Sequence, residues 1–172
     1  MRALVLAAVL LSAGTAQAQA PSTRIGAIGG ARANMGALGN RYSLGYVFGI
    51  EAGLMPSWFG VVWSLQYSSF ASSDPRNVED TLELFDLDVG ARIRLAPKPD
   101  VPAWLWLQLG FDLLRSNIPV EPDLDTSYYG PTARVGGELV LGKFILSLGA
   151  DYGLIFDGPS GLRLIFFVGV GD

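Results

Sequence analysis

The 172-residue chain has no histidine and no cysteine, and only 16% of its residues carry charge. Without histidine, neither a Ser-His-Asp triad nor most transition-metal sites can be built. Without cysteine there is no disulfide framework, no thiol chemistry and no lipid attachment through a cysteine. The net charge is −4 and basic residues form no run, so a nucleic-acid partner is not expected.

Long hydrophobic runs are also scarce. The N-terminal run, residues 3–13, follows Arg2 and precedes the small-x-small sequence Ala16-Gln17-Ala18. This arrangement predicts a secretory signal peptide over residues 1–18, with cleavage after Ala18 favoured over cleavage after Ala20. A single domain is expected over residues 19–172. No later stretch reaches the roughly 18 unbroken apolar residues of a membrane helix.

Strict alternation of apolar and small or polar residues takes the place of such runs. It is clearest over residues 42–54, where every even position is apolar and Val47 is the one large apolar residue at an odd position. A period of two is typical of a β-strand with one apolar face. Thirteen residues rising about 3.3 Å each, tilted by about 45°, cover roughly 30 Å, the thickness of the bilayer hydrocarbon. The segment therefore has the length and pattern of a transmembrane strand.

The same pattern recurs along the chain and predicts an all-β fold, an eight-stranded antiparallel up-and-down transmembrane β-barrel. The expected strands are residues 23–33, 42–54, 59–70, 82–95, 103–115, 127–141, 144–156 and 162–171. Longer connections (34–41, 71–80, 116–126, 157–161) alternate with mostly shorter ones (55–58, 96–102, 142–143). With both termini in the periplasm, the longer connections would face the outside of the cell.

The inward face of the expected barrel carries a balanced set of charges, six acids and six bases. They are Arg24, Arg32, Glu51, Asp86, Asp88, Arg92, Arg94, Asp112, Arg134, Glu138, Asp151 and Arg163. An eight-stranded barrel is only wide enough for its own side chains. Balanced charge in so narrow a space favours ion pairs across the lumen over a water-filled conduit.

Two acidic groups have alternative interpretations. Asp86 and Asp88, two residues apart on one strand face, could perform acid–base catalysis or bind a cation, but pairing with lumen arginines is the favoured interpretation. Glu121, Asp123 and Asp125 could ligate Ca²⁺ through oxygen. Their spacing is not that of a known calcium loop, which favours a solvated acidic loop.

With its signal peptide, eight alternating segments and aromatic residues at the expected membrane rims, the chain resembles the small outer-membrane barrels of the OmpA/OmpX type. The rim aromatics are Tyr42, Trp58, Phe59, Tyr129, Phe144 and Phe156. The resemblance implies a place in the outer membrane of a Gram-negative cell envelope, with outer-membrane lipid and the barrel assembly machinery as partners. It implies no cofactor, no metal and no catalytic residues.

Three functions are compatible with the sequence. The leading one is a non-enzymatic outer-membrane protein with a structural or surface-interaction role and a closed, charge-paired lumen. The second is a narrow channel for ions or small solutes, lined by the same charges. The third is a soluble periplasmic barrel that binds lipid in the manner of a lipocalin, which would require the apolar set to face inward.

Overall fold

The computed structural model describes most of the chain after the expected signal peptide. The described residues are 22–35, 37–73, 81–95, 102–117, 126–156 and 158–172. The expected signal peptide and the acidic cluster Glu121, Asp123 and Asp125 lie outside these ranges.

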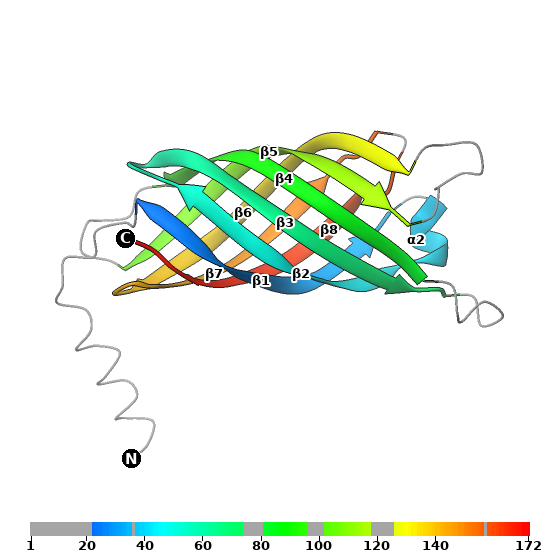
Figure 1. Cartoon of the computed structure of the whole chain (residues 1–172), viewed down its shortest axis with the longest axis horizontal. Coiled ribbons are helices and arrows are strands. Elements are labelled where there is room, and N and C mark those ends of the chain that lie inside the picture. Colours follow the sequence, from blue (N-terminus) through cyan, green and yellow to red (C-terminus); the bar gives the residue numbers. More distant parts are fainter. Residues whose placement is uncertain (1–21, 36, 74–80, 96–101, 118–125, 157) are drawn as a thin grey trace, which may run out of the picture.

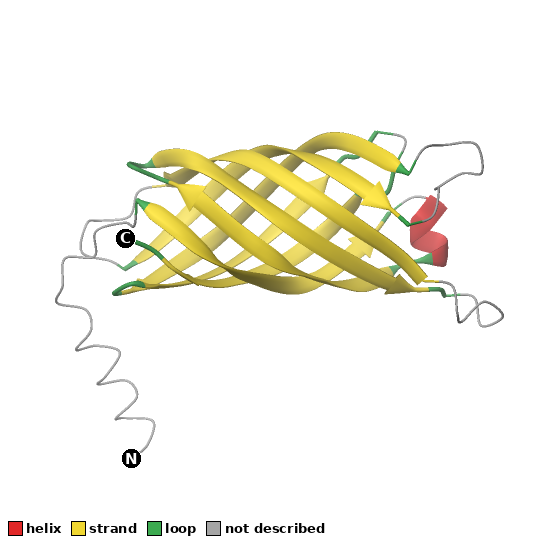
Figure 2. Cartoon of the chain, viewed as in Figure 1, coloured by secondary structure: helices red, strands yellow, loops and turns green. Residues whose placement is uncertain are grey.

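Eight antiparallel strands form one closed barrel in which each strand pairs with its neighbours in sequence, and β8 closes onto β1 (Figures 1 and 2). The strands are β1 (Thr23–Asn34), β2 (Leu44–Leu54), β3 (Phe59–Ala71), β4 (Thr81–Leu95), β5 (Ala103–Ser116), β6 (Ser127–Leu141), β7 (Phe144–Gly153) and β8 (Gly161–Val170). The predicted fold class is confirmed.

The two ends of the barrel differ. At one end, called here the terminal end, lie the start of β1, the C-terminus and the β6–β7 turn (Figure 1). That turn is two residues long, and Gly142 takes a φ of 64°, which a side chain would strain. The opposite end, called here the loop end, carries the short helix α2 (Ala37–Arg41). In the described ranges, no helix is both long and apolar enough to cross a membrane.

The alternation of side chains follows the sequence prediction on every strand. Leu109 and Leu148 on the outer wall are 61% and 66% exposed, whereas Asp88 and Arg92 on the inner wall are at 0% and 1%. The apolar set therefore faces out and the charged set faces in. The lipocalin interpretation, which requires the reverse, is wrong.

One prediction failed at the start of β2. We expected Tyr42 to be an outward rim aromatic on a strand beginning at residue 42, but β2 begins at Leu44 and the Tyr42 side chain is buried. The expected glycine-rich connection contains helix α2 immediately before Tyr42, so the strand phase does not extend to this residue. Asn34 Nδ2 donates a hydrogen bond to the Tyr42 carbonyl oxygen at 2.9 Å and holds this segment inside the barrel mouth.

A second difference concerns the end of β7, which was expected to reach Phe156 but stops at Gly153. The next residue, Leu154, donates its N–H to the carbonyl of Pro131 on β6 at 3.0 Å. Pro131 has no N–H to return, so the regular ladder ends there. Only an isolated bridge between Tyr129 and Phe156 continues the pairing. The other expected rim aromatics, Trp58, Phe59, Tyr129, Phe144 and Phe156, are exposed as predicted.

Candidate functional site: the charged lumen

All twelve charged residues predicted for the inner face point into the lumen, and each is at most 4% exposed. They come from seven of the eight strands. Where one strand carries several of them, they are an even number of residues apart, because alternate residues share one face. Their arrangement divides into a group near the terminal end, a central arginine and a group nearer the loop end.

The terminal-end group is built around two glutamates. Arg24 contacts Glu51 at 2.9 Å through Nη2 and Glu138 through Nη1. Arg94 approaches the second oxygen of Glu138 at 3.2 Å, and Arg92 approaches Glu51 at 3.1 Å. Each glutamate is thus shared between arginines, so neither has a single ion-pair partner.

Arg134, on β6, connects the two groups. Its Nη1 donates to Glu51 Oε2 at 2.9 Å across the lumen, while Nε donates to Asp151 at 3.0 Å on the neighbouring strand. Asp88 lies 3.8 Å from its other terminal nitrogen. A planar guanidinium with five N–H donors suits such a branching position, which a lysine could not reproduce.

The loop-end group is built around Arg163. Three aspartates surround this side chain: Asp151 at 2.5 Å, Asp112 at 2.7 Å and Asp86 at 3.7 Å. Arg32 reaches the same Asp86 oxygen at 2.8 Å and also donates to the carbonyl of Pro159 in the β7–β8 connection. Asp86 and Asp88, the carboxylates considered for catalysis, are therefore both engaged by arginines.

Taken together, these contacts form one continuous network of six acids and six bases. Water hardly reaches it, so each charge depends on its partners for compensation. Such a network adds little net stability compared with an apolar core, but removing a single member leaves an uncompensated charge at a cost of about 3–5 kcal/mol. The network thus makes the lumen intolerant of single changes.

Neutral side chains complete the network, and the charge pattern alone did not single them out. Gln108 accepts from Arg92 at 2.8 Å and donates to Asp88 at 2.8 Å. Thr132 also donates to Asp88 at 2.8 Å. Trp106 lies beneath the Arg92 guanidinium, 4.2 Å from carbon to ring centre, and donates its indole N–H to Ser147. Their inward phase was readable from the sequence, but their partners depend on cross-lumen geometry.

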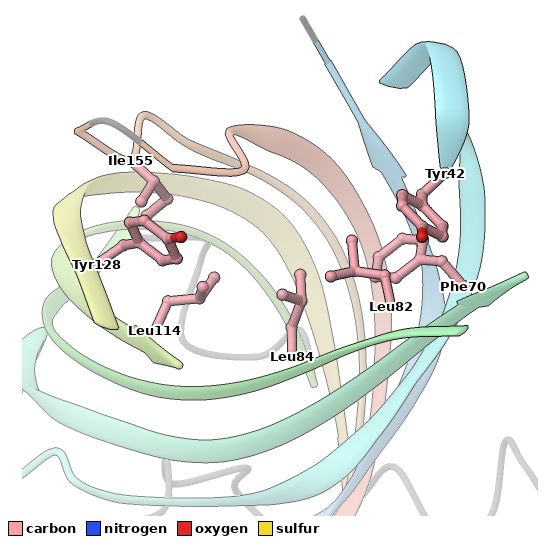
Figure 3. Packing of buried hydrophobic residues seen from close by; sticks show 7 residues of the cluster. All are labelled: Tyr42, Phe70, Leu82, Leu84, Leu114, Tyr128 and Ile155. Carbon is pink, nitrogen blue, oxygen red and sulfur yellow. The ribbon is translucent and has the colours of Figure 1, made fainter. Parts of the chain in front are cut away.

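Two apolar clusters lie in the interior beside the network. Figure 3 shows the side chains of the first cluster, which project into the mouth at the loop end. Leu84 lies between one group of side chains around Tyr42 and another around Tyr128. The cluster comprises Tyr42, Phe70, Leu82, Leu84, Leu114, Tyr128 and Ile155. A second cluster comprises Ile28, Val47, Val140, Ile145, Ile165 and Phe167, with Trp104 packed against it. The ring centre of Phe167 in this second cluster lies 4.1 Å from the guanidinium carbon of Arg24. Phe167 therefore joins the second cluster to the charged network.

One small cavity lies beside the network. A cavity of about 10 Å³ lies among Glu51, Arg92, Trp106 and Arg134, at the lower limit of what one water molecule needs. In the part of the chain that the structure describes, no group of three or more His, Cys, Asp or Glu residues is placed to hold a metal ion. The arrangement is suited to closing and bracing the barrel, because every carboxylate faces arginines across a nearly dry space.

Comparison with known proteins gives the class of this fold. No family model matches the chain, and no curated protein matches it in sequence. Among solved structures, Neisserial surface protein A superposes with a TM-score of 0.65 at 15% identity, over 88% of this chain and 97% of that chain. OprG from Pseudomonas aeruginosa gives a TM-score of 0.58 at 10% identity, over 90% and 97% of the two chains. Ail from Yersinia pestis in a phospholipid nanodisc gives 0.54 at 13% identity, over 87% and 98%.

The fold is therefore that of the small eight-stranded outer-membrane barrels, and the expected resemblance is confirmed at this level. The solved chains are matched over nearly their whole length, so the likeness extends to the complete barrel.

Proposed function

We propose that the chain is an integral outer-membrane β-barrel protein without catalytic activity, whose lumen is closed by ion pairs and which serves a structural or surface-interaction role. The observation that carries the proposal is the division of side chains between the two faces of the wall. Large apolar residues are exposed on the outer face of every strand, while the twelve charged residues of the lumen are buried. In water such an outer wall would be an extensive apolar patch, whereas in lipid it is the expected surface.

Exposed aromatic residues at both ends of the wall support the membrane assignment. Trp58, Phe59 and Phe144 lie at the terminal end, and Tyr129 and Phe156 lie toward the loop end. Aromatic girdles of this kind flank the apolar band of outer-membrane barrels. Outer-membrane lipid and the barrel assembly machinery are accordingly the proposed partners, and the loop end is the proposed surface-exposed end.

The narrow-channel alternative receives less support. A selective pore is lined by one sign of charge and leaves a path for water. Here the lumen charges are balanced and mutually paired, and apolar side chains occupy the mouth at the loop end.

The membrane assignment is tested by fractionation of cells expressing the full chain. The protein should stay with the outer-membrane fraction through high-salt and carbonate washes and be released only by detergent. Recovery in the soluble periplasmic fraction would contradict the proposal. The variant Leu148→Arg is the matched control, since a charge on the outer wall should reduce the amount recovered in the membrane.

A further inference from the structure

Near the loop end, the charged network of the lumen holds more acids than bases. Arg134 borders this part of the network, but it shares its charge with Glu51 of the terminal-end group. The balance of the whole network therefore conceals a local excess of negative charge toward the loop end. The residues concerned are the aspartates Asp86, Asp88, Asp112 and Asp151 and the arginines Arg32 and Arg163.

Asp88 is the aspartate of this set with the most distant cation. Each of the other three has an arginine nitrogen within 2.8 Å. The nearest one to Asp88 is Arg134 Nη2 at 3.8 Å, which is beyond hydrogen-bond distance. Its close partners are neutral, because the Gln108 amide and the Thr132 hydroxyl each donate to it at 2.8 Å. Asp88 is fully buried, so water does not supply the missing compensation.

A second carboxylate faces Asp88 directly. Asp112 is its register partner on β5, and residues directly opposite in an antiparallel pair have Cβ atoms about 4.5–5.5 Å apart. One oxygen of Asp112 contacts Arg163 at 2.7 Å. The other oxygen, Oδ1, is buried and has no hydrogen-bond partner among the described residues. Two facing carboxylates in a dry space cannot both carry charge without a large cost.

The other groups around Asp88 do not remove this cost. Its register partner on β3 is the neutral Ser64, and Asp86 lies two residues away on the same face of β4. Arg163 on β8 is already surrounded by three aspartates. Asp151 on β7 binds both Arg163 and Arg134. These contacts leave Asp88 without a close cation of its own in the described part of the chain.

We propose that Asp88 binds one proton in the folded barrel and donates it to Asp112 Oδ1. The proton removes one of the two facing charges and provides a donor for the unpartnered oxygen. Gln108 and Thr132 remain as neutral partners of Asp88. The pair is thus a proton-binding site inside the lumen. The inference goes beyond the proposed function, since it requires the folded barrel but neither the membrane location nor the surface role.

The test is infrared spectroscopy of the folded protein in an ester-free detergent, where lipid esters do not mask the carbonyl band of a protonated carboxylic acid. At about pH 6 an isolated aspartate is almost fully ionised, so a band at this pH reports a carboxyl group that holds its proton. The wild type should show the band and lose it on alkaline titration. Asp88→Asn should lack the band, and Asp172→Asn, which changes an exposed carboxylate at the terminal end, should keep it.

Urea unfolding in the same detergent and at the same pH provides a second readout. Asp88→Asn should leave the unfolding midpoint at the wild-type value or raise it, because no arginine loses a close partner. Asp151→Asn should lower the midpoint, because Arg134 and Arg163 both lose one. The inference is overturned if the wild type lacks the band or if Asp88→Asn retains it. It is also overturned if Asp88→Asn fails to fold or unfolds as early as Asp151→Asn.

Discussion

Glu51 on β2 and Arg134 on β6 lie on opposite sides of the eight-stranded barrel, and their side chains meet in the lumen at 2.9 Å. Glu51 also contacts Arg24 and Arg92, and Arg134 also contacts Asp151. This contact joins the two charged groups of the lumen into one network. Neutralising Glu51 would therefore remove a shared counter-charge from three arginines, Arg24, Arg92 and Arg134.

Glu51→Gln should lower the free energy of unfolding by about 3–5 kcal/mol, because three buried arginines lose a shared counter-charge. Urea unfolding in lipid vesicles, followed by tryptophan fluorescence, measures this change. Combining Glu51→Gln with Arg134→Gln should cost less than the sum of the single changes, with a coupling of about 0.5–3 kcal/mol. Strict additivity would show that the cross-lumen contact carries no energy. Lys143→Gln, an exposed control, should unfold like the wild type.

Two adjacent glycines on β6 give a matched pair for lumen packing. A Cβ on Gly136 would lie 2.3 Å from the Leu148 carbonyl oxygen and 2.4 Å from the Trp106 ring, whereas a Cβ on Gly137 meets nothing closer than 3.9 Å. Gly136→Ala should therefore destabilise the barrel by about 1–3 kcal/mol through overpacking. Gly137→Ala should stay within about 0.5 kcal/mol of wild type in the same unfolding assay. Equal effects would mean that the two side-chain directions are not as the structure has them.

Charge on the outer wall should cost more at mid-strand than near the rim. Leu148 lies in the middle of β7 and is 66% exposed, whereas Phe156 lies beyond the end of the strand beside Tyr129. Leu148→Arg should cost about 2–4 kcal/mol of stability in lipid and Phe156→Arg about 0–1 kcal/mol. Refolding yield and unfolding midpoint in vesicles measure both variants. Similar penalties at the two depths would argue against a membrane around this wall.

The strand phases and the inward charges could be predicted because a period of two is a local property of the chain. Arg92 and Asp88, for example, face inward by parity alone, without knowledge of any partner. The pairing of Arg163 with Asp86, Asp112 and Asp151 could not be predicted in this way. It depends on strand tilt and register around the whole barrel, which set the heights at which lumen side chains meet.

The errors lie where the backbone leaves the ladder. Tyr42 was assigned by extending the phase of β2 backward past its first residue, Leu44, into the segment that follows helix α2, where no strand fixes the parity. The end of β7 was placed by side-chain alternation at Phe156, although Pro131 on the neighbouring strand lacks the N–H that continued pairing needs. Apolar alternation therefore indicates which way a side chain points, while hydrogen-bonding capacity determines where a strand stops.

The measurement that tests the closed lumen most directly is current through wild-type protein in a planar lipid bilayer at neutral pH. Insertion is verified independently in vesicles, and a general porin in the same membrane serves as the positive control. Because the balanced network and the apolar mouth leave a cavity of only about 10 Å³ beside Glu51 and Arg92, we expect no steady conductance steps from the inserted protein. Steady, ohmic openings would contradict a closed lumen and establish the channel function in its place.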